Sequence, residues 1–430
     1  MTVQPLNVES SVPLSSLADV VLGKMLQPRA QRDGDVEVPY LRSASIQDSE
    51  LDLGGVKRMW ASPLEAVALD LRAGDVVVSE GGSVGRAAVL REDLPGVIFQ
   101  NSVNRLRPRH GVDGRFLAYV LSAIRHSGYF SVYCDAVSIA HLTAEKLGRL
   151  RIPAADADAQ QRIADYLDRE TAAIDALIDK QRGLVAGLRR RRATAIVAAT
   201  SGMQANGDRG ESASSWLKDM PAHWSELPIK RVLTDVQSGY WGSDEVGDGT
   251  DVRVVRVADF DRPTLSVGTA PTIRSVTPSE RAKAALRRGD LLMEKSGGTG
   301  INPVGFVVSY ESDEESIFAN FIVRLRPRPD QHARFWLYAL NGAYTSGLTW
   351  KSVNQTTGIQ NLDMASFMSE VFPVPPLDEQ REIADHLDRE TAKIDALIAK
   401  AERFIELAQE RRAALITAAV TVQIEIPTED

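Results

Sequence analysis

One stretch of this chain occurs twice, and the duplication constrains the architecture more than any other feature. Residues 163–178 read IADYLDRETAAIDALI and residues 383–398 read IADHLDRETAKIDALI, a separation of 220 positions. Only two positions differ between the copies. An internal repeat of this kind predicts two similar halves, and each copy opens a segment without proline in which apolar residues follow helical spacing.

We therefore expect two long helices, over residues 153–202 and 374–426. Packing these helices against each other as a coiled coil would bury the apolar stripe of each. The alternative is that each helix lies on its own domain. The stripes also include Leu184 and Phe404, and the residues expected at the interface or against a partner are Ile163, Leu167, Ile174, Leu177, Ile178, Ile383, Leu387, Ile394, Leu397 and Ile398.

Two strand-rich regions of mixed structure precede these helices, at residues 1–152 and 221–373, with a Gly/Ser-rich linker at 203–220. LRAGDVVVSEGG at 71–82 matches LRRGDLLMEKSGG at 286–298, and FQNSVNRLRPR at 99–109 matches FANFIVRLRPR at 318–328. In the first region we expect strands near 75–78 and 96–99, a helix over 114–126 and a short helix capped by Thr143. The fold class is α+β, with a twofold internal repeat.

Composition excludes several classes of protein. Hydrophobic residues make up 43% and charged residues 25% of the 430 positions, as in ordinary globular chains. No apolar run is long enough to span a membrane, and the N-terminus lacks the pattern of a signal peptide. With Cys134 as the single cysteine and six scattered histidines, we expect no metal and no cofactor. A cytoplasmic protein is expected, and the net charge of −8 does not exclude DNA, which responds to a local patch.

Glycine-rich loops recur at one framework position in the two strand-rich regions, within residues 80–86 and 294–305. Neither loop is a P-loop or a dinucleotide fingerprint. Glycine there lets the backbone approach phosphate or base edges closely, and the alternative is an ordinary turn between strands. The candidate residues are Glu80, Gly81, Gly82, Ser83, Arg86, Lys295, Ser296, Gly297, Gly298 and Asn302.

Polar side chains cluster beside these loops in the sequence. Asn and Gln can pair with adenine and Arg with guanine, so these residues are candidates for DNA contact. The arginines of the LRPR segments could equally be solvated, and the aromatic pair at 240–241 could be core. The candidates are Lys24, Gln27, Gln100, Asn101, Arg105, Tyr240, Trp241, Asn320, Arg324, Gln355, Thr356 and Thr357.

The charges of the repeated helices are typical of a solvated face, although their near-identity also suggests a matched docking surface for two copies of one partner. The basic run at 189–192 becomes QERR in the second copy, which favours a solvated role over a phosphate clamp. No catalytic tetrapeptide, nucleophile elbow or clustered acid pair is present. We expect no catalytic activity.

The sequence resembles the specificity subunit of type I restriction–modification systems. The resemblance rests on the repeat, on the GD-strand-GG loops of the two strand-rich regions, and on the order of the parts, in which each strand-rich region, or head, is followed by a long helix. The resemblance covers essentially the whole chain. In the first copy IPAADADAQQRIAD replaces the tighter VPPLDEQREIAD, which affects only the corner before the helix.

The resemblance implies a non-catalytic subunit whose two heads each read one half of a split, asymmetric target in double-stranded DNA. It also implies an antiparallel coiled coil that sets the spacer and docks two methyltransferase subunits, which methylate adenine, and a restriction subunit that joins them. Two rival classes remain: a nucleotide-binding enzyme that uses the glycine loops, and an adaptor whose heads bind proteins.

Overall fold

The structure is a computed structural model that describes residue 6 and residues 10–47, 50–134, 141–298, 302–356 and 359–427. The chain divides into two compact units. Unit 1 comprises Met1–Arg182 together with Arg403–Asp430, and unit 2 comprises Gly183–Glu402. Each long helix therefore contributes one half to each unit.

Head 1, the part of unit 1 that precedes the first long helix, contains two sheets. The antiparallel sheet has the order β2-β8-β5-β6 and the smaller sheet the order β4-β3-β7, with a separate pair β1-β9. The strands are β1 (Ser11–Pro13), β2 (Ala18–Leu22), β3 (Val36–Leu41), β4 (Lys57–Ala61), β5 (Val76–Ser79), β6 (Ala87–Val89), β7 (Ile98–Phe99), β8 (Val103–Pro108) and β9 (Arg151–Pro153). The helical segments are η1 (Leu14–Ser16), η2 (Ser43–Ser45), α1 (Pro63–Ala68), α2 (Gly114–His126), α3 (Tyr129–Tyr133) and α4 (Ala144–Arg149).

The strand β5 shows how the core of head 1 is divided. Successive side chains of a strand point to opposite faces. Val76 and Val78 pack with α2 in one buried cluster, whereas Val77 belongs to the cluster around the smaller sheet. The strands expected near residues 75–78 and 96–99, the helix over 114–126 and the N-cap Thr143 are all confirmed.

Head 2, the part of unit 2 that lies between the two long helices in the sequence, has two sheets like head 1 and further strands. Its main sheet has the order β13-β21-β18-β19-β16-β15, accompanied by the sheet β17-β14-β20 and three strand pairs. The strands are β10 (Arg209–Glu211), β11 (Asp219–Pro221), β12 (Ser225–Pro228), β13 (Leu233–Ser238), β14 (Asp251–Val255), β15 (Phe260–Asp261), β16 (Ser266–Val267), β17 (Ile273–Ser275), β18 (Leu291–Glu294), β19 (Val307–Ser309), β20 (Ser316–Phe318), β21 (Ile322–Pro327), β22 (Val353–Thr356), β23 (Ile359–Leu362) and β24 (Val371–Val374). The helical segments are η3 (Ile229–Arg231), η4 (Val257–Asp259), α6 (Pro278–Ala284), α7 (Ala333–Thr345), η5 (Leu348–Ser352) and α8 (Met364–Phe367).

The segment 203–220, expected to be a linker, contains regular structure. Strands β10 and β11 pair antiparallel within and beside it, and Trp216 packs on Phe372 with a ring-centroid distance of 5.5 Å. Trp224 follows this segment and donates from Nε1 to Glu379 at 2.9 Å. Because these aromatic and polar contacts tie the segment to head 2, it is a structured part of unit 2.

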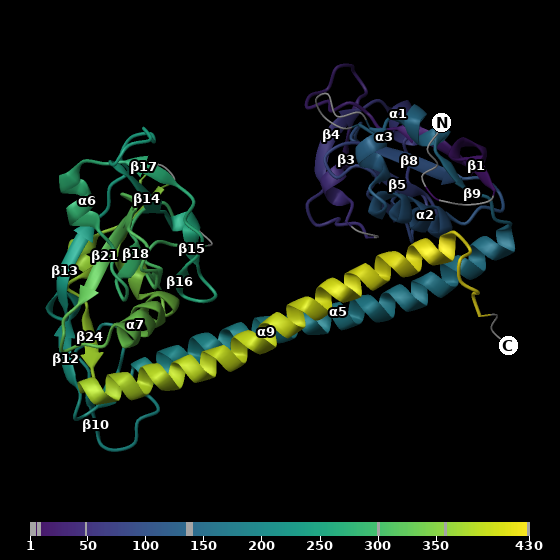
Figure 1. Cartoon of the computed structure of the whole chain (residues 1–430). Coiled ribbons are helices and arrows are strands. Elements are labelled where there is room, and N and C mark those ends of the chain that lie inside the picture. Colours follow the sequence, from purple (N-terminus) through teal and green to yellow (C-terminus); the bar gives the residue numbers. More distant parts are fainter. Residues whose placement is uncertain are drawn as a thin grey trace. The chain divides into compact units, whose positions relative to one another are not determined.

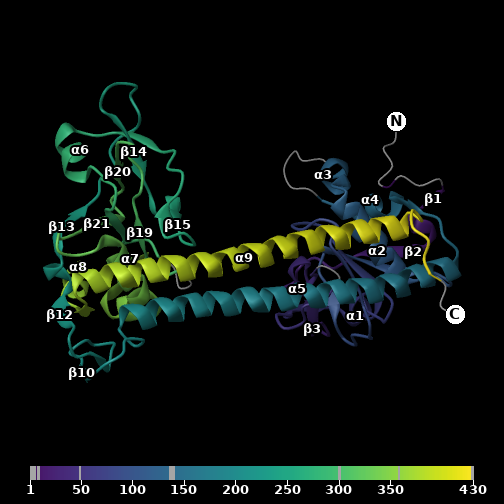
Figure 2. The ribbon, with the colours of Figure 1, turned by 60° about the horizontal axis from the view of Figure 1, so that its bottom comes forward.

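The two long helices are α5 (Ala157–Thr200) and α9 (Leu377–Val420), each of 44 residues. In unit 1 the first half of α5 and the last half of α9 run side by side along head 1, as Figures 1 and 2 both show. Ile174 and Ile178 pack there against Ala408. The α+β fold with two long paired helices is confirmed, and each helix half also packs on a head.

One ion pair occurs in both units at repeat-equivalent positions. Arg412 Nε lies 3.0 Å from an Asp175 carboxylate oxygen in unit 1, and Arg192 Nε lies 2.9 Å from Asp395 in unit 2. Arg189 also pairs with Glu402 at 2.8 Å. The basic run at 189–192 is thus partly used to join the helices in unit 2, so the expectation of a fully solvated run is wrong for Arg192.

Candidate nucleic-acid interface and partner surface

In head 2 the glycine loop connects β18 to β19 and lies between two other segments. Lys295 N donates to the carbonyl of Phe321, in the turn before β21, at 2.9 Å. On the other side Gly297 N donates to the carbonyl of Gln360, in β23, at 3.0 Å. A Cβ atom on Gly298 would lie 2.6 Å from a backbone nitrogen, so only glycine fits there. Three segments converge at one edge of the head.

The side chains at this edge are mostly polar. Lys295 Nζ donates to Ser238 Oγ at 2.9 Å, and burial lowers the pKa of Lys295. Ser296 Oγ donates to Asn361 Oδ1 at 2.6 Å. Ser296 is buried, and we call the surface around it the head 2 edge, defined by Ser238, Lys295, Asn320, Phe321 and Asn361.

The corresponding loop of head 1 is held by a serine and an aromatic ring. Ser43 Oγ donates to the Gly81 carbonyl at 2.8 Å. Gly82 and Gly85 have φ angles of 72° and 75°, and a Cβ atom on Gly85 would lie 2.2 Å from the Phe130 ring. Glycine at these positions is therefore a steric requirement of the turn, in addition to any role toward a ligand.

Three other candidates in this loop differ in exposure. Ser83 is exposed, whereas Arg86 is half-buried and donates to the Ile46 carbonyl at 3.2 Å. Burial raises the pKa of Glu80, and the nearby His141 opposes that rise. Ser83 is thus the side chain of this loop that is most open to solvent.

Lys24 and Gln27 hold head 1 together rather than forming an open surface. Lys24 Nζ pairs with Glu65 at 2.6 Å, and this hydrogen bond is the main reason that the pKa of Glu65 is lowered to about 2. Gln27 is buried, and its Nε2 donates to Asp35 at 2.9 Å. Both side chains are thus engaged within head 1, and their contact with DNA stays a prediction.

Arg105 and Arg324 also have a structural role that the sequence did not indicate. Each is only 5% exposed. Arg105 Nη1 donates to the carbonyl of Asp70 at 2.6 Å, and Arg324 Nη1 donates to the carbonyl of Ala285, which occupies the equivalent position, at 2.6 Å. Both guanidinium groups brace the turn that follows a short helix, so they are not available to bases in this conformation.

The second arginine of each RLRPR segment binds the aspartate of the Gly-Asp sequence that recurs in both heads. Arg107 Nη2 lies 2.7 Å from Asp75, and Arg326 Nε lies 2.6 Å from Asp290. Both aspartates are 2% exposed. The two sequence motifs are therefore the two sides of one buried ion pair in each head.

The remaining polar and aromatic candidates of the strand-rich regions lie in different environments. Gln100 and Asn101 are half-buried in the turn before β8. Asn320 is exposed at the equivalent turn of head 2. Tyr240 packs against the core of head 2, whereas Trp241 is exposed. The guanidinium carbon of Arg274 lies 4.7 Å from the Trp241 ring centroid.

The hairpin that carries three further candidates is described only in part. The backbone of Gln355 and Thr356 belongs to β22, and Thr357 lies outside the described residues. Asn302, in the glycine loop of head 2, is exposed. Its contact with DNA stays a prediction.

Sequence reasoning missed two features near the glycine loop of head 2. Phe321 is exposed although its head 1 equivalent is a serine. Arg262 Nη2 pairs with buried Glu294 at 2.7 Å and lies over the Phe306 ring. Burial raises the pKa of Glu294 against the opposing effect of Arg262. Only an alignment of the two heads, which places serines opposite Phe321 and Glu294, could have drawn attention to them.

The repeated helix motif anchors each head to its helix. Tyr119 Oη donates to Asp168 at 2.7 Å in unit 1, and Tyr338 Oη donates to Asp388 at 2.6 Å in unit 2. These aspartates are one repeat apart. Both are half-buried instead of fully solvated, because they join each long helix to the adjacent head.

A glutamine three residues before each copy of the repeat makes a second anchor. Gln160 Oε1 accepts a hydrogen bond from the backbone of Asp113 at 3.1 Å, and Gln380 Oε1 accepts one from the backbone of His332 at 2.8 Å. Both glutamines are buried. They bind the chain at the start of α2 and of α7, so these glutamines and the aspartates of the repeat are both explained by contacts within the chain.

Four large apolar side chains of the helices remain exposed. Leu177 is 46% and its repeat equivalent Leu397 is 50% exposed. Leu184 and its equivalent Phe404 are exposed as well. The expectation that these residues are buried between the helices is wrong. Both copies of the repeat present the same apolar positions to solvent, and none of the four residues belongs to a buried cluster of the described residues.

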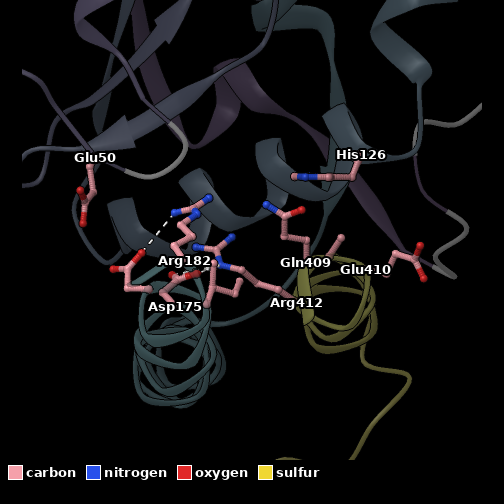
Figure 3. A pocket seen from close by; sticks show the side chains of 10 residues that line it. Glu50, His126, Asp175, Arg182, Gln409, Glu410 and Arg412 are labelled. Atoms are coloured by element: carbon pink, nitrogen blue, oxygen red, sulfur yellow. Dashed lines mark hydrogen bonds and ion pairs between the residues drawn. The ribbon is translucent and has the colours of Figure 1, made fainter. Parts of the chain in front are cut away.

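A crevice of about 680 Å³ lies in unit 1 between head 1 and the helices (Figure 3). The charges of the two arginines that line it are balanced by carboxylates, because Arg412 pairs with Asp175, and Arg182 pairs with Asp179 at 3.1 Å. Glu410 adds a further negative charge at its rim. Such a lining does not favour phosphate, so the crevice gives no support to a nucleotide site.

Within the described ranges, no group of three or more His, Cys, Asp or Glu residues is placed to hold a metal ion. Among the helices of the same residues, none is long and apolar enough to cross a membrane.

A family model for the type I restriction modification DNA specificity domain matches residues 10–182 and 281–406. The specificity subunit of the type I restriction enzyme StySPI from Salmonella potsdam is 21% identical over 401 residues, which cover 90% of this chain and 83% of that protein. The EcoBI specificity subunit from Escherichia coli is 19% identical over 282 residues, 63% of this chain and 58% of that protein.

Two solved structures share the fold. A chain from a structural study of complex assembly and conformational transition of the type I R-M system has a TM-score of 0.64 at 17% identity, covering 96% of this chain and 97% of that one. The HsdS subunit from Thermoanaerobacter tengcongensis has a TM-score of 0.50 at 17% identity, covering 99% of this chain and all of that one.

Proposed function

The chain belongs to the type I restriction–modification DNA specificity family, and we propose that its two heads read the two unlike halves of one split target in double-stranded DNA. A single observation carries this proposal. The helix repeats are nearly identical and anchor their heads by the same contacts, whereas the exposed side chains around the glycine loops differ. Equivalent supports with different surfaces fit one reader of two different half-sites.

The chain is a recognition subunit, and we assign methylation of adenine and cleavage of DNA to partner subunits. No residue set described above resembles a nucleophile with its base. A reader of DNA needs donors, acceptors and apolar groups at base edges, and the head 2 edge supplies all three. We place the contacts of head 1 around the exposed part of its glycine loop, at Gly82 and Ser83.

We propose that two methyltransferase subunits dock on the helices, one on each copy of the repeat. Leu177 and Leu397 recur at the same position of the two copies and are exposed. An exposed apolar surface at matched positions fits two copies of one partner. We propose further that a restriction subunit joins this complex and that the complex works in the cytoplasm.

Phosphate contacts dominate the affinity of proteins for DNA, and this chain carries a net charge of −8. Many of its arginines are also engaged in ion pairs with aspartates or glutamates, as the pairs of Arg107 and Arg326 illustrate. We therefore expect the isolated chain to bind DNA weakly and the partner subunits to provide much of the phosphate contact.

The test is co-expression with the methyltransferase partner, followed by genome-wide mapping of methylated adenine. A bipartite motif is expected, and replacing residues 221–373 with the equivalent region of a relative should change one half of it only. A motif that is unchanged by this exchange would refute the proposed role of the heads. Binding of ATP or S-adenosylmethionine by the isolated chain would instead favour a nucleotide-binding enzyme, and we expect neither.

A further inference from the structure

Phe321 lies in the turn between β20 and β21 and is 48% exposed. The backbone of this turn is fixed, because Ile322 N donates to the Ala319 carbonyl at 3.0 Å and Lys295 N donates to the Phe321 carbonyl at 2.9 Å. The ring is not part of the buried cluster of head 2. A rigid turn thus presents a large apolar side chain to solvent.

The ring lies beside the glycine loop. A Cβ atom on Gly297, which has a φ angle of 108°, would lie 3.7 Å from Phe321 Cδ2. Asn320 precedes Phe321 in the chain, and Lys295 is held beside the turn by its backbone hydrogen bond to the Phe321 carbonyl. An aromatic group, a cation and an amide at one edge match the mixed surface that reads base edges in the major groove, where both polar and apolar contacts discriminate.

The equivalent residue of head 1 shows what the framework itself requires. Glu80 N donates to the Ser102 carbonyl at 2.9 Å, as Lys295 N does to the carbonyl of Phe321. Ser102 Oγ accepts a hydrogen bond from the backbone of Ser43 at 3.2 Å, so this side chain is used within head 1. The fold is compatible with a small polar residue at this position, so the framework does not require the exposed ring of head 2.

We propose that Phe321 is a specificity residue that contacts the C5-methyl group of one thymine in the half-site read by head 2. Thymine is the one base that presents a methyl group in the major groove, and an apolar side chain distinguishes it from cytosine there. This inference rests on the proposed role of head 2 in reading DNA and adds which chemical group is read and by which residue.

The experiment uses the complex of the full chain with its methyltransferase partner and a duplex that contains the mapped target. Each thymine of the half-site assigned to head 2 is replaced in turn by uracil, which lacks only the methyl group. One position should weaken binding by about fourfold, the effect expected from burial of one methyl group. With Phe321→Ala the same position should show no loss between thymine and uracil.

Trp350→Ala provides the matched control. Trp350 is another exposed aromatic residue of head 2, outside the head 2 edge, and its removal should leave the uracil effect unchanged. A half-site with no uracil-sensitive position, or with a position equally sensitive in Phe321→Ala, would overturn the inference while the mapped motif still supported the proposed function. Absence of any bipartite motif in the wild-type complex would remove both.

Discussion

Replacement of Asp290 by asparagine should strongly destabilise unit 2, because it removes one partner of a buried ion pair. Asp290 is 2% exposed and binds Arg326 through both carboxylate oxygens, at 2.6 and 2.7 Å. It also accepts a hydrogen bond from the backbone of Arg287 at 2.8 Å. The asparagine can keep only part of this set and leaves the guanidinium without a counter-charge.

The magnitude follows from burial. Breaking a buried ion pair costs about 3–5 kcal/mol. The lower end applies, since the Arg326 side chain is 26% exposed and water can solvate part of its charge. A loss of about 3 kcal/mol in a unit of this size corresponds to a fall of about 6–12 °C in melting temperature.

Tryptophan fluorescence during thermal unfolding is the appropriate assay. Five of the six tryptophans lie between Trp216 and Trp350, and Trp60 is in head 1, so emission reports mainly on unit 2. Asp75→Asn, the equivalent change in head 1, should lower the transition seen by circular dichroism and barely move the transition of the fluorescence. Arg328→Gln, which breaks an exposed pair, should have no measurable effect. A fall of less than about 2 °C in Asp290→Asn would refute the reasoning.

Three further changes test other parts of the structure. Glu294→Gln should gain stability relative to the wild type as pH rises above the ordinary glutamate value of 4.5. The reason is that the raised pKa of Glu294 makes the wild-type folded state lose stability as this carboxyl ionises, whereas glutamine does not ionise. Urea titrations of both proteins at several pH values measure this, and a difference in unfolding free energy that stays constant with pH would contradict the argument. Gly239→Ala should cost about 1–3 kcal/mol or more, because its Cβ would lie 2.1 Å from the Phe318 carbonyl, and an unchanged urea midpoint would contradict this. Leu177→Ser together with Leu397→Ser should weaken co-purification of the methyltransferase partner at least tenfold without lowering the melting temperature, and full retention of the partner would exclude these residues from the docking surface.

The duplicated architecture was predictable because the repeat is nearly identical and each copy carries helical periodicity. The residues that pack between the two helices were not predictable from the sequence. Ile174 and Ile178 are buried, whereas Leu177 is exposed. All three fit apolar spacing of three or four residues, so the stripe read from the sequence is wider than the face that packs. Spacing alone cannot tell which edge of a wide stripe meets another helix.

The candidate site was only partly predictable for a similar reason. Glycine loops and their positions in the framework could be found from recurrence in the two heads. Arg105 and Arg107 lie on either side of a leucine in β8. Arg105 binds the carbonyl of Asp70 and Arg107 the carboxylate of Asp75, and both partners lie more than thirty residues earlier in the chain. Base-reading chemistry and structural ion pairs use the same residue types, and partners distant in sequence decide between them.

The composition of unit 1 has a consequence for the order in which the protein is completed during synthesis. Its core includes Ile416, Ala419 and Val420, at the end of α9, packed with residues of head 1. Unit 2, in contrast, is one continuous stretch of chain. Domains usually fold in the order in which they leave the ribosome. Here the head that is translated first is the last to be finished, and it waits for the final helix while the second head already has all of its residues.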